Sequence, residues 1–271
     1  MLTYTEGHSD VCIVGAGAAG LMATIWATRS NPQRSITVLD GARKLGSKIL
    51  VAGGGRCNVT HDVASAEAFA CSSRNAIRIE LQRFDVAPTL AFFRQLGVAL
   101  KREETGKLFP VSDDAHTVLN ALLAAAHTPN VRFLQPCRVE QILHQDGKFT
   151  LSGEWGTWVA DQVVLATGGK SLPKSGSDGS GYELARRLGH TITPHVFPAL
   201  VPLTLPTEHF LCALSGLTTA ATFSVQLANG KTVASFTDSA LCTHTGLSGP
   251  AVLDISRYWI EAQLTEQSED R

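Results

Sequence analysis

A glycine-rich turn between an apolar strand and a helix is the feature that most constrains this chain. Residues 15–20 read GAGAAG and fit the pattern G-x-G-x-x-G. They follow the apolar run Val11–Val14 and open the segment Ala18–Arg29, which is rich in Ala and stops before Pro32. In this pattern the first glycine permits a tight turn, the second admits a pyrophosphate, and the third lets the helix pack on the strand. The turn predicts a phosphate site on the N–H groups that begin the helix.

An acidic residue at the expected distance supports this reading. A second apolar strand, Ser35–Leu39, ends at Asp40, which follows Gly20 by 20 positions. A carboxylate there accepts hydrogen bonds from ribose hydroxyls and repels the 2′-phosphate of NADP. Strand, turn, helix and strand in this order predict an α/β fold with a parallel sheet. The alternative is a plain glycine turn in another α/β protein, which does not explain Asp40.

The turn alone does not separate NAD from FAD, and two further features favour FAD. Residues 53–58 read GGGRCN, a second glycine cluster in the long loop 41–60, where the backbone can approach a flat or charged ligand closely. Arg56 is suited to pair with a pyrophosphate and Asn58 to bond a polar ring edge. The alternative is a flexible surface loop. The second feature is Val163–Gly169, VVLATGG, an apolar strand that brings a backbone turn to the same edge of the sheet.

The pattern of the remaining chain predicts two domains. We expect helices over Asn75–Phe84, Val86–Leu96 and Ala115–His127, inside a largely helical segment at about 62–128. Trp158–Val159 and Gln162–Ala166 are predicted as separate strands. Four prolines in 194–206 indicate a boundary near 199, so residues 1–198 form the first domain and 199–271 part of a mainly β domain. A hairpin is expected around Asn229-Gly230.

Composition excludes several classes of function. The 271 residues carry a formal net charge of -1, so no excess of cations points to nucleic acid. We expect no membrane segment and no secretory signal. The six scattered cysteines include no C-x-x-C, which favours a reducing cytoplasm over a disulfide framework. Cys57 and His61 are too few ligands for a metal site, so no metal is expected.

Several long stretches resemble one known family. They include residues 41–61, 106–122 and 166–190, the segment PALVPL at 198–203, and THTGLSGPAVLDIS at 243–256. Together they are similar to the YhiN-type (BaiN-like) flavoproteins, a family of NAD(P)/FAD-dependent oxidoreductases. The resemblance implies a FAD-binding Rossmann-like domain interrupted by an inserted β domain. It also implies FAD as cofactor, NAD(P)H as a reductant, and hydride transfer through the flavin to or from a small organic molecule.

The resemblance assigns the cofactor-binding residues. In the family the glycine turn binds the pyrophosphate, and the residue that corresponds to Asp40 binds the ribose. Val139 corresponds to a strand residue that contacts adenine, and Thr167 and Gly168 close over the phosphate side. Other residues lie on the loop that would cover the cofactor. The full set is Gly15, Gly17, Ala18, Ala19, Gly20, Asp40, Arg43, Lys48, Gly55, Arg56, Asn58, Val139, Thr167 and Gly168. No catalytic residue is named, because flavin enzymes leave the hard chemistry to the cofactor. Cys57 is read as a packing residue, and His244 as a residue that stabilises its turn.

Members of this family continue beyond the position of Arg271 and return to the first domain with a glycine-rich segment at the flavin end. The resemblance therefore implies that this chain encodes the adenosine and pyrophosphate half of the site and lacks part of the flavin half. Two alternatives to an enzyme follow. One is a truncated fragment without catalysis, and the other is a flavoprotein-like module that acts by binding partners.

Overall fold

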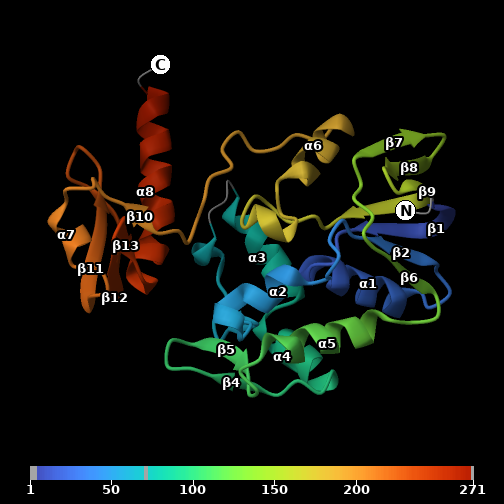
Figure 1. Cartoon of the computed structure of the whole chain (residues 1–271), viewed down its shortest axis with the longest axis horizontal. Coiled ribbons are helices and arrows are strands. Elements are labelled where there is room, and N and C mark those ends of the chain that lie inside the picture. Colours follow the sequence, from blue (N-terminus) through green and yellow to red (C-terminus); the bar gives the residue numbers. More distant parts are fainter. Residues whose placement is uncertain (1–4, 70–72, 270–271) are drawn as a thin grey trace. The chain divides into compact units, whose positions relative to one another are not determined.

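The computed structural model describes residues 5–69 and 73–269 of the chain. The chain divides into two compact units, Met1–Ile192 and Thr193–Arg271. The division falls at the start of the proline-rich segment in which the sequence predicted a boundary. Each unit has its own sheet and is described separately below (Figure 1).

A six-stranded sheet forms the centre of the first unit, in the order β6-β2-β1-β9-β8-β7. The first four of these strands are parallel neighbours, and β8 and β7 continue the sheet in antiparallel fashion. All four residues of β2 are buried, as expected for a strand covered on both faces. The predicted Rossmann-like α/β class is confirmed. The strands are β1 (Thr5–Val14), β2 (Ile36–Leu39), β6 (Val131–Leu134), β7 (Gln141–Gln145), β8 (Lys148–Gly153) and β9 (Gly156–Leu165).

Strand β9 is continuous where the sequence predicted two short strands. The charged residue Asp161 interrupts the apolar pattern between the two predicted pieces. In the structure its carboxylate lies at the surface, 3.0 Å from Lys148 Nζ and 3.4 Å from His8 Nε2. The backbone therefore continues through this position without burying a charge.

Two helices of the first unit begin at an aspartate whose side chain caps them. The Asp85 carboxylate accepts from Ala87 N at 2.9 Å, and Asp114 accepts from His116 N at 2.9 Å. Apolar side chains of four of these helices share one core, which includes Ile25, Ile49, Phe92 and Leu122. The helices are α1 (Ala18–Ser30), α2 (Ser47–Val51), α3 (Arg74–Arg83), α4 (Val86–Gln95), α5 (Ala115–Ala126) and α6 (Ser180–Arg187).

A small three-stranded sheet and three 3₁₀ turns complete the first unit. The sheet has the order β3-β5-β4, and its two pairs of neighbouring strands are antiparallel. These elements are β3 (Thr60–His61), β4 (Leu100–Arg102), β5 (Lys107–Pro110), η1 (Ala52–Gly55), η2 (Ala66–Ala68) and η3 (Pro173–Ser175).

The second unit combines an antiparallel sheet with a long helix. Its sheet has the order β10-β13-β12-β11 and contains the predicted hairpin, with longer strands than expected. The 20-residue helix α8 was not anticipated by the mainly β prediction. Val252 and Ile255 of this helix are buried, and Tyr258 lies 5.7 Å from the Phe236 ring of the sheet. The elements are β10 (Leu203–Thr204), α7 (Phe210–Ala213), β11 (Thr218–Gln226), β12 (Thr232–Thr243), β13 (Gly246–Ser248) and α8 (Pro250–Glu269).

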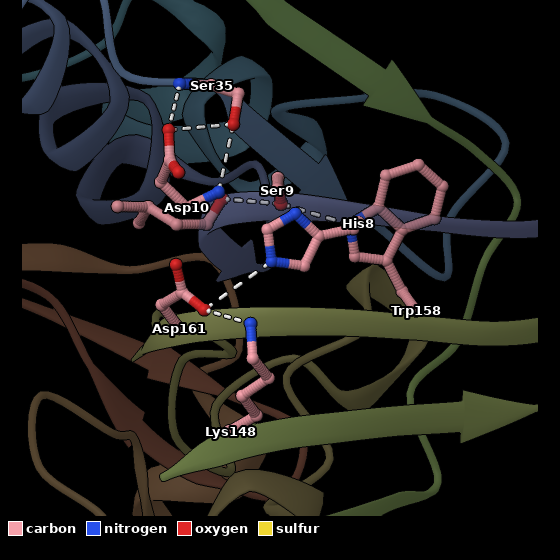
Figure 2. A network of polar contacts seen from close by, with 8 residues as sticks. His8, Ser9, Asp10, Ser35, Lys148, Trp158 and Asp161 are labelled. Atoms are coloured by element: carbon pink, nitrogen blue, oxygen red, sulfur yellow. Dashed lines mark hydrogen bonds and ion pairs between the residues drawn. The ribbon is translucent and has the colours of Figure 1, made fainter.

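Polar side chains tie β1 to its two neighbours (Figure 2). The Asp10 carboxylate accepts from the backbone N–H of Ser35 at 2.7 Å and from its hydroxyl at 2.8 Å. On the other side of β1, Trp158 Nε1 donates to Ser9 Oγ at 3.0 Å, and Ser9 Oγ donates to Val11 O. These bonds satisfy polar groups at the edge of the core, which would otherwise cost stability.

The Asp10 network predicts an acid-dependent loss of stability. The backbone N–H of Ser35, followed by its hydroxyl, lowers the pKa of Asp10 in the folded state. The stabilisation is therefore complete above the unfolded-state pKa of about 3.9 and is lost as the pH falls through the lower folded-state value. We expect Asp10→Asn to lower the free energy of unfolding at pH 7 by about 1 kcal/mol, the net worth of one hydrogen bond. Urea unfolding at pH 7 and pH 3 measures both effects.

The variant should also lose less stability than the wild type between pH 5 and pH 3. Glu154→Gln is the matched control, because it removes one carboxylate from an exposed position. An equal pH dependence in Asp10→Asn and the wild type would contradict the assignment to Asp10.

Candidate functional site

The glycine turn joins β1 to α1 by contacts that leave no room for a side chain at its first and third glycines. A Cβ on Gly15, whose φ is 104°, would lie 2.5 Å from Ala166 O. A Cβ on Gly20 would overlap the Gly15 carbonyl oxygen. By contrast, a Cβ on Gly17 would meet nothing within 4 Å. The first and third glycines are thus required for packing, whereas the second faces open space.

The start of α1 offers free donors beside that open space. The first intrahelical bond runs from Leu21 N to Gly17 O at 2.9 Å, so the N–H groups of Ala18, Ala19 and Gly20 precede the hydrogen-bonded turns. No side chain caps this helix in the described part of the chain. Ala18 and Ala19 are exposed. Open space, free N–H groups and the helix dipole together fit an anionic group such as a pyrophosphate.

Asp40 lies directly against the glycine turn. Its Oδ2 accepts from Ala16 N at 2.6 Å, and its Oδ1 accepts from Ala42 N at 2.7 Å. Each carboxylate oxygen retains a second lone pair that a ribose hydroxyl can use. The structure thus brings Asp40 and the turn together, while its contact with ribose remains a prediction.

The exit of β9 forms the opposite wall. Ala166 N donates to Val14 O at 2.9 Å, which holds Thr167 and Gly168 beside the end of β1. A Cβ on Gly168 would lie 2.5 Å from Ser177 Oγ, and a Cβ on Gly181 would overlap the Thr167 hydroxyl. Both predicted residues are therefore fixed between the glycine turn and the start of α6.

Arg138 is a residue of this region that the sequence did not single out. Its guanidinium donates to Asp178 Oδ2 at 2.7 Å, and its carbonyl accepts from Trp155 Nε1 at 2.6 Å. It precedes the buried Val139, the predicted adenine contact. The Asp178 carboxylate also accepts from Ser180 N at 3.0 Å, and that N–H, with help from Arg138, lowers the pKa of Asp178 to about 2. The Arg138–Asp178 pair joins segments that are far apart in sequence, so no local pattern could reveal it.

Two cationic side chains of the loop 41–60, Lys48 and Arg56, contact different parts of the first unit. Lys48 of α2 donates to Ser177 Oγ at 2.6 Å, next to Gly168. Arg56 instead lies 4.0 Å above the Phe109 ring and binds Glu103 Oε1 at 2.5 Å, with Asp113 at 3.7 Å. Arg56 therefore faces the β4–β5 hairpin, and its predicted pairing with a pyrophosphate stays a prediction.

The other predicted cofactor-binding residues of this loop are Arg43, Gly55 and Asn58. Gly55 has a φ of 87°, a backbone conformation that favours glycine, and Arg43 and Asn58 are exposed. Cofactor contacts of these three residues remain predictions.

Cys57 and His244, which the sequence analysis assigned structural roles, lie in the helical core and in an exposed turn. Cys57 belongs to the helical core, and burial raises the pKa of its thiol, which suits a packing residue better than a reactive thiolate. His244 is exposed in the turn between β12 and β13. No group of three potential metal ligands occurs among the residues that the structure describes. Within the same residues, no helix combines the length and the apolar character needed to cross a bilayer.

The second and third glycines of the turn, Gly17 and Gly20, predict a clean separation of binding from folding. Gly17 has a φ of -76° and space beside it, so Gly17→Val should leave the unfolding midpoint unchanged. Its side chain should fill the place of a pyrophosphate and weaken dinucleotide binding about 100-fold, or about 2.7 kcal/mol. Gly20→Ala should instead destabilise the fold by about 1–3 kcal/mol, because its methyl group overlaps Gly15 O.

Thermal unfolding and ADP titration of both variants measure these effects. Gly147→Val, in the exposed β7–β8 turn, is the control for dinucleotide affinity alone, because the φ of 73° at Gly147 strains a valine there and should lower its unfolding midpoint. Undiminished ADP affinity in Gly17→Val would place the site elsewhere.

Comparison with known proteins identifies relatives of this arrangement. The family described as "HI0933-like protein Rossmann domain" matches residues 9–256. A 3-dehydro-bile acid delta(4,6)-reductase from Clostridium scindens is 36% identical over 246 residues, which are 91% of this chain and 59% of that protein. Ribosomal RNA dihydrouridine synthase from Escherichia coli is 34% identical over 252 residues, or 92% of this chain and 61% of that protein.

The corresponding synthase from Haemophilus influenzae is 33% identical over 264 residues, which cover 96% of this chain and 64% of that protein. The chain thus spans about 60% of the length of these relatives. The family predicted from the sequence motifs is confirmed: the chain belongs to the HI0933-like family, whose matching model describes a Rossmann domain.

Proposed function

We propose that this chain acts in a FAD-dependent reductase that delivers hydride to a C=C bond conjugated with a carbonyl group. The observation that carries the proposal is the chemistry named for its relatives. A 3-dehydro-delta(4,6) bile acid contains C=C bonds conjugated with a ketone, and dihydrouridine arises by reduction of a C=C bond conjugated with a ring carbonyl. The two substrates differ in size and charge but share this reaction. The sequence alone left the direction of hydride transfer open, and the relatives favour reduction of the substrate.

The residues of the first unit account for binding of the cofactor. In this proposal the N–H groups of Ala18 and Ala19 bind the pyrophosphate, Asp40 receives a ribose hydroxyl, and Val139 lies along adenine. Thr167 and Gly168 close the opposite side of the crevice. Bound FAD supplies the redox chemistry, and the protein orients it and limits access of water. NADH or NADPH is the proposed source of hydride.

A small molecule is the proposed substrate, because the net charge of -1 provides no general attraction for a polyanion. RNA is the second candidate, and the names of the two dihydrouridine synthases favour it. The loops that surround the site add local support, since residues 41–60 and 166–177 contain Lys and Arg but no Asp or Glu. A cytoplasmic location is also proposed, in keeping with the five free cysteines among the described residues.

Cofactor uptake and turnover test the proposal in sequence. The purified chain should acquire the visible absorbance of oxidised flavin when FAD is added. Under anaerobic conditions NADH or NADPH should bleach that absorbance, and a conjugated 3-oxo steroid should restore it. The saturated 3-oxo steroid is the control, because it has no C=C bond to accept hydride. Unmodified ribosomal RNA replaces the steroid in a parallel reaction, with dihydrouridine as the product measured.

Each stage separates the alternatives. A chain that takes up no FAD would support a fragment without catalysis. A chain that binds FAD but is reoxidised by neither acceptor would support a binding module. Reoxidation by RNA alone would replace the small-molecule substrate with the second candidate.

A further inference from the structure

One hydrogen bond crosses the carboxyl end of β1. Lys48 Nζ donates to Ser177 Oγ at 2.6 Å, although the two residues are 129 positions apart. Lys48 belongs to the loop after β2, and Ser177 to the loop after β9. Because β1 lies between β2 and β9 in the sheet, this bond joins the two loops on either side of the glycine turn. This is the crevice in which Rossmann folds hold a dinucleotide.

The two partners in this bond differ in charge, because the Lys48 ammonium is cationic and the Ser177 hydroxyl is neutral. Lys48 is half-buried, and no carboxylate pairs with it among the residues that the structure describes. Its acceptor is a neutral hydroxyl, and Ser177 is 6% exposed. A Cβ on Gly168 would lie 2.5 Å from Ser177 Oγ and 3.8 Å from Lys48 Nζ, so Gly168 provides the space for both. A half-buried ammonium gains more from an anionic oxygen than from a hydroxyl.

We propose that Ser177 is a positioning residue that holds Lys48 across the crevice until a dinucleotide enters. Lys48 then exchanges the Ser177 hydroxyl for a phosphate oxygen. The Lys48–Ser177 hydrogen bond, which we call the strap, therefore opens as the ligand binds. This inference rests on the proposed FAD site. It adds a residue that acts through Lys48 and not through the cofactor.

The strap predicts effects of opposite sign at its two ends. Loss of the Ser177 hydroxyl frees Lys48 and removes the barrier to entry, so association should accelerate. Loss of the Lys48 charge removes the attraction for phosphate, so affinity should fall. A purely structural role for the buried Ser177 predicts instead that both changes weaken binding, because each would loosen the same wall of the site.

Rapid-mixing measurement of FAD fluorescence on binding to the apoprotein tests these effects. Ser177→Ala should raise the association rate constant about fivefold, the factor that a hydrogen bond of typical net strength is worth. Ser177→Cys should do the same, since a thiol keeps the volume but is a weak acceptor. Lys48→Met should weaken FAD binding about tenfold and reduce the effect of salt on it, as expected for loss of a charge-assisted bond.

Matched controls come from the same two loops. Lys44→Met removes an exposed charge four residues from Lys48, and Ser175→Ala removes a hydroxyl that bonds within its own turn to Leu172 O. Both should leave the association rate near that of the wild type. Faster association in both Ser177 variants together with weaker binding in Lys48→Met supports the strap.

Two outcomes would overturn the inference, and they differ in what else they remove. If the wild type binds FAD and both Ser177 variants associate no faster, the strap is wrong while the FAD site stands. If the wild type takes up no FAD, the proposed site and the strap fail together.

Discussion

The close approach of Gly20 to the Gly15 carbonyl is the contact on which the rest of the first unit depends. It lets α1 start immediately after β1 and pack on the sheet without an intervening side chain. The position of α1 in turn fixes where its unbonded N–H groups point. The contact of Gly15 with Ala166 then brings the end of β9 to the same place. The candidate phosphate site and its opposite wall therefore follow from two glycines that leave room for close backbone contacts.

Features set by neighbours in the chain were predicted from the sequence. The glycine turn and Asp40 at the end of β2 each depend on neighbouring residues or on a fixed motif spacing. Local backbone geometry and apolar periodicity determine such features directly. They were sufficient to establish the fold class, and the phosphate end of the site that they indicate stays a prediction.

Features set by distant residues were not predicted. Arg138 pairs with Asp178, which lies 40 positions away in the sequence. Arg56 contacts Glu103 and the face of Phe109, partners that its own loop does not reveal, while its pairing with a phosphate stays a prediction. Strand β9 continues through Asp161 because the sheet places this carboxylate at the surface beside Lys148, which the residues around Asp161 do not reveal. Tertiary packing decides such cases, and one sequence read alone does not contain it.

The short side chain of Asp40 explains how the site is kept in order. With one carboxylate oxygen on Ala16 N and the other on Ala42 N, it joins the glycine turn to the start of the covering loop. A longer side chain such as Glu would place its carboxylate farther from both N–H groups and leave the turn less restrained. A ribose hydroxyl that binds here adds to an arrangement already formed, so less of its binding free energy is spent on ordering the protein. Asp40 thus orders the backbone of the turn, and the same geometry places its carboxylate for the predicted contact with ribose.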